Sequence, residues 1–176
     1  MDINSFIIGF KKGKQSGGGG DGSDVKYIEK RYAEVNLQEA TRIKPYFFYM
    51  DSTIETISMP KVVEIGQNAF QGCMKLRTVN LPEGLISVGV SAFSGCNLAE
   101  SLVLPSTLQT IGGSAFSSGT IRVVTFRGKP QSIGLSYMPA LHSNVTTVNC
   151  PWSEGEVAGA PWGATSAQIN YNYTGG

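Results

Sequence analysis

The chain has few of the residues on which enzyme and metal chemistry usually depend. It contains one histidine, His142, and three cysteines, and an odd number of cysteines does not favour a disulfide framework. No second cysteine or histidine lies at the spacing of a metal site. The one close carboxylate pair, Glu154 and Glu156, suits the start of a short turn, whereas a glycosidase needs two carboxylates that face each other across a cleft. We therefore expect no enzymatic activity, no metal and no cofactor.

Charged residues and long apolar runs are also scarce. Lys and Arg number 14 and Asp and Glu 13, so the net charge is +1 and does not favour specific binding of nucleic acid. Lys11, Lys12 and Lys14 can give only weak, salt-sensitive contacts with a polyanion. No apolar run reaches the ~18 residues of a membrane span. The chain begins apolar and then becomes basic, which is the opposite order to a secretory signal.

Glycine and internal repetition are what the sequence has in excess. Phe48, Phe70, Phe93, Phe116 and Met138 recur at steps of 22, 23, 23 and 22 residues. A fixed period of this length is typical of a solenoid, in which each repeat packs only on its neighbours. Each repeat carries an apolar-x-x-apolar-x-apolar strand pattern, usually followed by proline. The predicted strands include Ile54-Ile57-Met59, Leu76-Val79-Leu81, Leu102-Leu104, Ile121-Val124-Phe126 and Val145-Val148-Cys150, after a first one at Tyr32-Val35-Leu37.

The opposite side of each repeat carries an Ala-Phe pair, for which we expect a short helical or turn-like segment with the ring in the core. Cys73 and Cys96 occupy one repeat position and are expected to be small buried hydrophobes. The chain divides into five segments. A docking segment at residues 1–14 and a glycine-rich linker at 15–23 come first. An N-terminal cap and half repeat at 24–42, the repeats at 43–151 and a C-terminal cap at 152–176 follow. In the C-terminal cap we expect Trp152 and Trp162 to cover the last turn of the core. We also expect a capping box at Ser153 and Glu156 that begins a short helical turn, and a covering strand at 167–173.

The block Ile-Gly-x-x-Ala-Phe-x-x-Cys-x-x-Leu-x-x-Val-x-Leu-Pro at residues 65–82 resembles the BspA-type leucine-rich repeat. Residues 88–105 and 111–126 are close copies, and 43–60 and 133–151 are divergent ones. The resemblance implies a β-rich (α/β), right-handed solenoid of about five to six turns of 22–24 residues with a cap at each end. Such repeats occur in bacterial surface adhesins and in phage and prophage structural proteins, and the flanking segments are similar to small repeat proteins of phages of gut Firmicutes.

The resemblance implies a virion structural protein, a fibre, spike or decoration of the phage head or tail, at the virion surface. The residues that dock this protein onto a capsid or tail protein would be Ile3, Phe6, Ile7, Ile8 and Phe10. The repeats would face a host cell-surface glycan or protein, and a homo-oligomer, a trimer by analogy with fibres, fits that role. The alternatives are a surface or secreted bacterial adhesin and a purely structural repeat module.

Outward positions of the predicted strands form polar rows that supply candidate ligand contacts. The candidate residues are Ser58, Arg77, Asn80, Arg122, Thr125 and Asn149. The same rows are also consistent with an ordinary soluble sheet face that carries cross-strand charge pairs. Tyr46, Tyr49 and Tyr137, on the Ala-Phe side of the coil, are secondary candidates.

Overall fold

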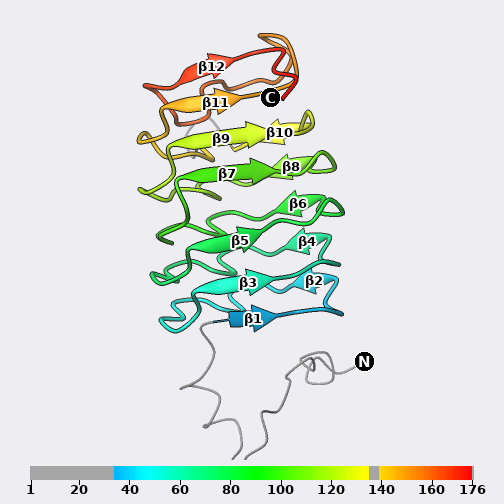
Figure 1. Ribbon diagram of the computed structural model, residues 1–176, viewed down its shortest axis with the longest axis vertical. Coiled ribbons are helices and arrows are strands. Elements are labelled where there is room, and N and C mark those ends of the chain that lie inside the picture. The colour runs from blue at the N-terminus through cyan, green and yellow to red at the C-terminus, as the bar shows by residue number, and fades with distance from the viewer. Residues whose placement is uncertain (1–33, 135–138, 176) are drawn as a thin grey trace, which may run out of the picture.

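The computed structural model describes residues 34–134 and 139–175, and every regular element in these ranges is a β-strand. The strands stack along the long axis of the molecule in about six turns (Figure 1), which confirms the predicted solenoid. In chain order they are β1 (Glu34–Asn36), β2 (Arg42–Ile43), β3 (Thr56–Ser58), β4 (Glu64–Ile65), β5 (Thr78–Asn80), β6 (Ser87–Val88), β7 (Ser101–Leu104), β8 (Thr110–Ile111), β9 (Val123–Phe126), β10 (Ser132–Ile133), β11 (Thr147–Asn149) and β12 (Gln168–Asn170).

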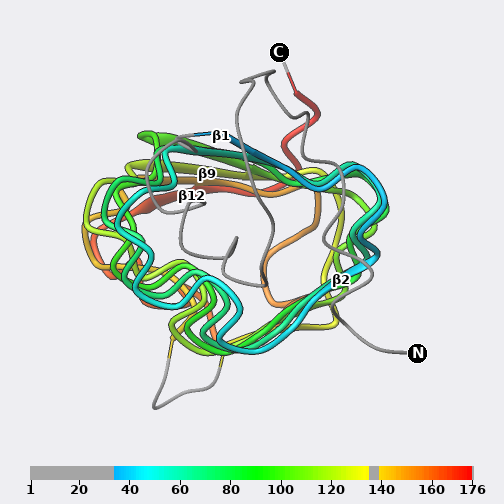
Figure 2. The same cartoon turned by 90° about the horizontal axis from the view of Figure 1, so that it is seen from below.

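Successive turns place their strands in two parallel walls, and the turns overlie one another when viewed along the solenoid (Figure 2). The first wall holds the odd-numbered strands and ends with β12, and the second wall holds β2, β4, β6, β8 and β10. Residues that pair across neighbouring strands lie about one repeat apart in the sequence, as do Val35 and Ile57, and Ile57 and Val79. The strands predicted from the apolar pattern of the sequence are therefore the strands of the first wall.

The second wall was not predicted. Each of its strands has only two residues, which is too short to show the alternation that identifies a strand. Its signal in the sequence is an apolar residue that recurs once in each repeat and, after the first repeat, precedes a glycine. All of these residues are buried: Ile43, Ile65, Val88, Ile111 and Ile133.

The Ala-Phe segments form turns rather than helices, so the helical alternative is wrong for the described residues. Asn68, Ser91 and Ser114 precede the alanines and have positive φ angles of 54–56°. Short polar residues tolerate this left-handed conformation, and it tightens the chain before it re-enters the core. Backbone N–H groups of each turn donate to carbonyls of the next turn, for example from Phe70 to Ala92 at 2.8 Å.

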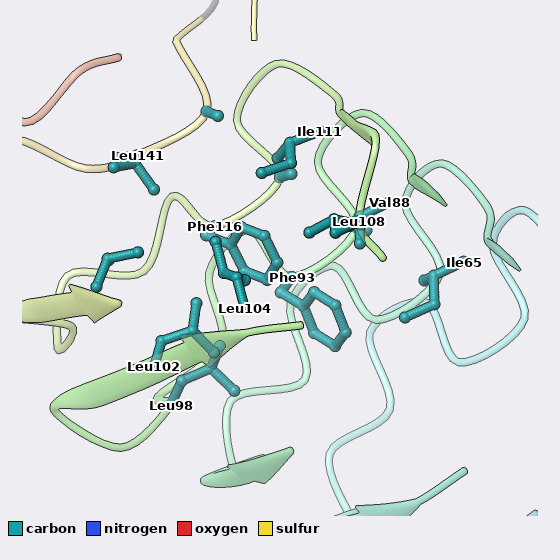
Figure 3. Packing of buried hydrophobic residues seen from close by; sticks show 14 of the residues in the cluster. Ile65, Val88, Phe93, Leu98, Leu102, Leu104, Leu108, Ile111, Phe116 and Leu141 are labelled. Atoms are coloured by element: carbon teal, nitrogen blue, oxygen red, sulfur yellow. The ribbon is translucent and has the colours of Figure 1, made fainter. Parts of the chain in front are cut away.

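A column of phenylalanine rings forms the centre of the core. Phe48, Phe70, Phe93 and Phe116 stack face to face with centroid separations of 5.1, 5.0 and 5.5 Å. Figure 3 shows two of these rings among the surrounding aliphatic side chains. Because burying one such ring contributes about 1.5–3 kcal/mol, this column is a major source of stability.

The buried cysteines have the structural role predicted for them. The thiols of Cys73 and Cys96 donate to the carbonyls of Phe48 and Phe70, in each case at 3.0 Å and in the preceding turn. All three cysteines of the chain are free and buried. Contact with the Cys73 thiol, together with burial, raises the pKa of the Cys96 thiol, and burial raises the pKa of Cys150 to about 11. Such thiols are poor nucleophiles.

A column of glycines lets successive turns approach closely. A Cβ atom on Gly66, Gly89 or Gly112 would lie 2.4–2.5 Å from a backbone nitrogen of the preceding turn. Real Cβ atoms do not come so close to backbone atoms. This steric limit explains why glycine follows the buried apolar residue at these three positions.

The C-terminal end of the core is covered by both tryptophans. Trp152 and Trp162 are buried, pack edge to face at 6.0 Å, and Trp152 also packs on Phe126 at 5.0 Å. β12 pairs with β11 as the expected covering strand. The backbone N–H of Ser153 donates to the Glu156 carboxylate at 2.7 Å, but residues 154–158 form turns and bends, so the predicted helical turn is wrong.

The first turn departs from the repeat pattern. Tyr46 and Met50 occupy positive-φ positions, at 61° and 58°, that hold Asn68 and Gly72 one turn later. The side chains of Tyr46, Tyr49 and Met50 are about half exposed, and Phe47 is 36% exposed. The predicted docking segment 1–14, the linker 15–23, the cap residues 24–33, Tyr137 and Met138 lie outside the described residues.

Candidate binding surface

The predicted ligand residues lie on the first wall, at positions set by strand pairing. Ser58 pairs with Asn80 across β3 and β5, and Thr125 pairs with Asn149 across β9 and β11. Arg77 and Arg122 lie directly before β5 and β9, and their backbone N–H groups donate to the backbone carbonyls of Glu55 and Glu100, respectively. The polar rows expected from the sequence therefore exist in two parts.

The two parts are separated by a break in the wall between β5 and β7. β5 pairs only with β3, and β7 pairs only with β9, among the strands of the described ranges. The cause is one extra residue: four positions separate Leu98 from Leu102, whereas three separate Leu76 from Val79. Ala99 still donates its N–H to the carbonyl of Arg77 at 2.8 Å, but the chain then bulges before it enters β7.

The break forms a notch of about 140 Å³ in the first wall. Arg77, Thr78 and Asn80 line it from β5 and its approach, and Ala99 and Ser101 line it from the β7 side. The side chains of all five residues are exposed. Among the described residues, the guanidinium of Arg77 has neither a hydrogen-bond partner nor an ion-pair partner. Two of the predicted ligand residues, Arg77 and Asn80, thus meet at the one interruption in the described part of this wall.

The chemistry of the notch is that of a hydrogen-bond donor site with one positive charge. A guanidinium presents a planar fork of donors that matches a carboxylate, whereas amide and hydroxyl groups both donate and accept. The facing edges of β5 and β7 add backbone groups that are not paired across the break. Such a site is suited to a hydroxyl-rich molecule that carries a carboxylate.

Asn149, another of the predicted ligand residues, is bonded within the protein. It is 8% exposed, and its amide donates to the hydroxyl of Thr125 at 3.1 Å and accepts from the amide of Asn170 at 2.7 Å. These bonds form a ladder across β9, β11 and β12 that satisfies polar groups at the capped end. The repeat pattern does not predict this role, because β12 belongs to the cap and not to the repeats.

The predicted cross-strand charge pairs are also wrong for Arg122. Its guanidinium donates to the carbonyls of Gly119 and Ile121 at 2.8 and 3.3 Å, so it is held within its own turn. The ion pairs of the described residues lie at the second wall and at the corners around it instead. They join Arg42 with Glu64, Lys61 with Glu39, Arg127 with Glu83 and Lys129 with Glu156.

Glu83 is the most highly connected of these acids. It accepts from Arg127 at 2.8 Å and from the backbone N–H and hydroxyl of Ser106 at 3.0 and 2.9 Å, and so links three turns. The hydrogen bond from Arg127 and that from the Ser106 backbone hold the pKa of Glu83 below its usual range. Because these groups already bind one another, they fasten the corner and are poor candidates for ligand contacts.

Two other hollows lack side chains with this chemistry. A shallow groove of about 480 Å³ runs along the second wall and is lined largely by the glycine column and by small polar residues. A hollow of about 430 Å³ lies beside the Pro161-Trp162 turn and is also lined by Gly134 and Pro139. Neither hollow is lined by a basic side chain.

The remaining titratable groups do not assemble into a centre. His142 is half-buried, and its Nδ1 accepts from the backbone N–H of Asn144 at 3.0 Å. Within residues 34–134 and 139–175, no three His, Cys, Asp or Glu residues are grouped as metal ligands. In the same ranges no helix is long and apolar enough to cross a bilayer.

Comparison with known proteins assigns the repeats. The BspA type leucine rich repeat region matches residues 39–156 in six copies, which is more than half of the chain. The chain belongs to the BspA-type leucine-rich repeat family. The crystal structure of a leucine-rich repeat protein from Bacteroides ovatus ATCC 8483 is similar over 77% of this chain, with 20% identity and a TM-score of 0.47. The match spans 40% of the solved chain, and no curated protein has a matching sequence.

BspA-type repeats are typically non-enzymatic, in agreement with the expectation drawn from composition. In this family member the consensus positions serve the core, since the phenylalanines, the cysteines and the glycines of the repeat are consumed in packing. The notch arises where the link before one strand, from Leu98 to Leu102, is one residue longer than the corresponding links. A comparison of link lengths between repeats would have located it from the sequence.

Proposed function

We propose that this BspA-type repeat protein is a binding module that recognises an acidic, hydroxyl-rich glycan at the notch between β5 and β7. The observation that supports the proposal is the exposed guanidinium of Arg77 beside the Asn80 amide and the Thr78 and Ser101 hydroxyls. Two other candidate residues of the wall, Arg122 and Asn149, are bonded within the protein. The notch is where the exposed guanidinium of Arg77 and several other polar groups lie together.

The size of the notch limits what it can hold. At about 140 Å³ it is smaller than the ~300 Å³ of typical small-molecule pockets, so it suits one sugar unit at the surface and not an enclosed ligand. A single contact of this kind is weak. Several copies on one carrier would raise the effective affinity by about 10²–10⁴ through multivalency, which suits a homo-oligomer such as a trimer.

We place the module on a phage particle, with Ile3, Phe6, Ile7, Ile8 and Phe10 docked on a capsid or tail protein and the repeats exposed at the virion surface. The support is the order of the sequence: an apolar segment, then three lysines, then a glycine-rich linker before the repeats. Deletion of residues 1–20 should abolish incorporation into particles while the repeats still fold. Normal incorporation would contradict the docking role.

Ligand recognition is tested separately from docking. The full chain is applied to a glycan array that contains sialylated, uronate-containing and neutral oligosaccharides, and hits are titrated by calorimetry. Arg77→Ala should weaken binding to an acidic glycan by about 10–150-fold, because a hydrogen bond to a charged group contributes about 1.5–3 kcal/mol. Arg77→Lys should recover only part of this loss, since lysine lacks the fork.

Arg122→Ala is the matched control. It removes an arginine from the same wall whose guanidinium is occupied by the Gly119 carbonyl, so binding should change by less than about twofold. The proposal is wrong if the wild-type chain binds no acidic glycan, or if the two alanine variants lose affinity equally. Surface protease shaving of an intact bacterium would instead reveal the chain if it is a cell-surface adhesin.

A further inference from the structure

The floor of the notch is apolar, although its rim is polar. Val79 lines the notch from β5, and Leu98 and Leu102 line it from the β7 side. All three belong to the apolar strand pattern whose residues pack toward the core. The notch therefore reaches from the polar face of the first wall down to the edge of the hydrophobic core.

Val79 is more exposed than its equivalents in other strands of the first wall. Ile57, Val124 and Val148 are 2%, 0% and 0% exposed, whereas Val79 is only partly buried. Strand pairing explains the difference. Ile57 pairs with Val79 and Leu102 pairs with Val124, but in the described part of the wall no pairing joins β5 to β7. The side of Val79 that a paired strand would cover faces the notch instead.

An apolar floor of this size suits a methyl group of the ligand. A sugar hydroxyl placed on Val79 would give up hydrogen bonds to water without replacing them. An acetamido group ends in a methyl, and its N–H and carbonyl can still bond to polar groups. The rim supplies such groups from Thr78, Asn80 and Ser101. Burial of one methyl-sized group strengthens binding about fourfold.

The charged and apolar parts of the notch lie at a distance that one sugar unit can span. Arg77 directly precedes β5, and Val79 is the middle residue of that strand. Two residues of an extended strand cover about 7 Å. A pyranose ring with a carboxylate on one side and an acetamido group on another reaches across this distance. The notch of about 140 Å³ takes these substituents while the ring lies over its mouth.

We infer that the acidic sugar recognised at the notch carries an acetamido group, with its methyl on Val79 and its carboxylate on Arg77. This inference rests on the proposed function and narrows the ligand to N-acetylated sugar acids. Neutral N-acetylated sugars lack the partner of the guanidinium, and simple uronic acids lack the methyl. Each of these sugars keeps only one of the two contacts.

Four methyl glycosides separate the two contacts when the full chain is titrated by NMR. N-acetylneuraminic acid carries both groups, and the nonulosonic acid with hydroxyl in place of acetamido carries only the carboxylate. N-acetylglucosamine carries only the acetamido group, and glucose carries neither. The N-acetylated acid should bind roughly 4–10-fold more tightly than its hydroxyl analogue. It should also bind more tightly than N-acetylglucosamine, and glucose should bind most weakly.

The outcomes distinguish this inference from the proposed function. Equal affinity for the two nonulosonic acids would overturn the inference and leave recognition of acidic glycans intact. Binding of uronates without binding of either nonulosonic acid would do the same. If the chain binds no acidic glycan at all, the proposed function and the inference both fail.

Val79→Thr replaces one methyl of the floor by a hydroxyl with little change of shape. It should reduce the preference for the N-acetylated acid to less than about twofold and leave the affinity for the hydroxyl analogue nearly unchanged. Val103→Thr is the matched control, because Val103 is 42% exposed on the same wall but does not line the notch. It should keep the wild-type preference. An unchanged preference in Val79→Thr would place the methyl elsewhere and overturn the inference.

Saturation-transfer NMR on the wild-type chain gives a test that does not depend on a folded variant. When the aliphatic protons of the protein are irradiated, the acetamido methyl of bound N-acetylneuraminic acid should receive more saturation than any ring proton. The reason is that the methyl is the group in contact with the apolar floor. Weaker saturation of the methyl than of the ring protons would show that it faces solvent, contrary to the inference.

Discussion

The glycine column yields the sharpest stability prediction, which is the effect of Gly89→Ala. The new Cβ would lie 2.4 Å from the backbone nitrogen of Gln67 and 2.7 Å from the carbonyl carbon of Gly66. Ordinary van der Waals contact begins at 3.4 Å, so the fit is short by about 1 Å, and both neighbours are main-chain atoms that cannot rotate away. Overpacking of this kind costs about 1–3 kcal/mol. For a chain of this size we expect the melting temperature to fall by about 2–12 °C.

Gly84→Ala is the matched control in the same repeat. A Cβ at Gly84 would have no neighbour within 4 Å, and its φ lies outside the left-handed region. Alanine there should be neutral or should stabilise the fold by up to about 1 kcal/mol, because it restricts the unfolded chain. Thermal unfolding followed by circular dichroism compares the two variants. If Gly89→Ala melts together with Gly84→Ala, close approach of successive turns is not what requires glycine in the repeat.

Four further variants test other parts of the structure. Phe93→Ala removes a ring that is stacked on both faces and should destabilise the fold by about 3–5 kcal/mol in denaturant titration; a loss below about 1 kcal/mol would contradict the column as a source of stability. Tyr46→Asn replaces a bulky residue at a φ of 61° and should stabilise the first turn by roughly 1 kcal/mol, seen as a higher melting temperature and not a lower one. Glu83→Gln should cost at most about 1 kcal/mol at pH 7, since the pair with Arg127 is exposed. The pKa of Glu83 is lower in the folded than in the unfolded chain. The stability difference between wild type and Glu83→Gln should therefore be complete above the unfolded pKa of about 4.3 and should disappear as the pH falls through the folded pKa. A stability difference that does not change with pH would refute the ion pair as its source. Deletion of Ala99 shortens the long link to the standard length, so it should close the notch and abolish glycan binding without loss of the fold; retained binding would place the ligand elsewhere.

The first wall and the ring column were predictable because they depend on residues that recur. Three apolar positions per strand, a terminal proline and one phenylalanine per turn were each visible several times, so accidental matches were averaged out. The second wall was not predictable by alternation, because a two-residue strand shows none. Its buried residues, such as Ile65 and Val88, nevertheless recur with the same period, and that recurrence could have identified it.

The candidate site was predictable only in part. Arg77 and Asn80 could be chosen from the sequence because outward strand positions follow from the pleat. Asn149 and Arg122 met the same criterion, yet their side chains are used within the protein. Asn149 is bonded by a strand that is not a repeat, and Arg122 by carbonyls of its own turn. Neither partner is encoded in the repeat pattern, so repeat position alone could not separate ligand residues from structural ones.

The places where repeats differ carry the distinctive chemistry of this solenoid. A regular rung satisfies its backbone groups through the turns above and below, and it leaves nothing for a partner except side chains. At the extra residue between Leu98 and Leu102 two strands of the described part of the chain fail to pair. Open backbone groups there lie beside exposed side chains that the consensus does not contain. The consensus accounts for how the chain folds, and this interruption is where specific binding should be sought.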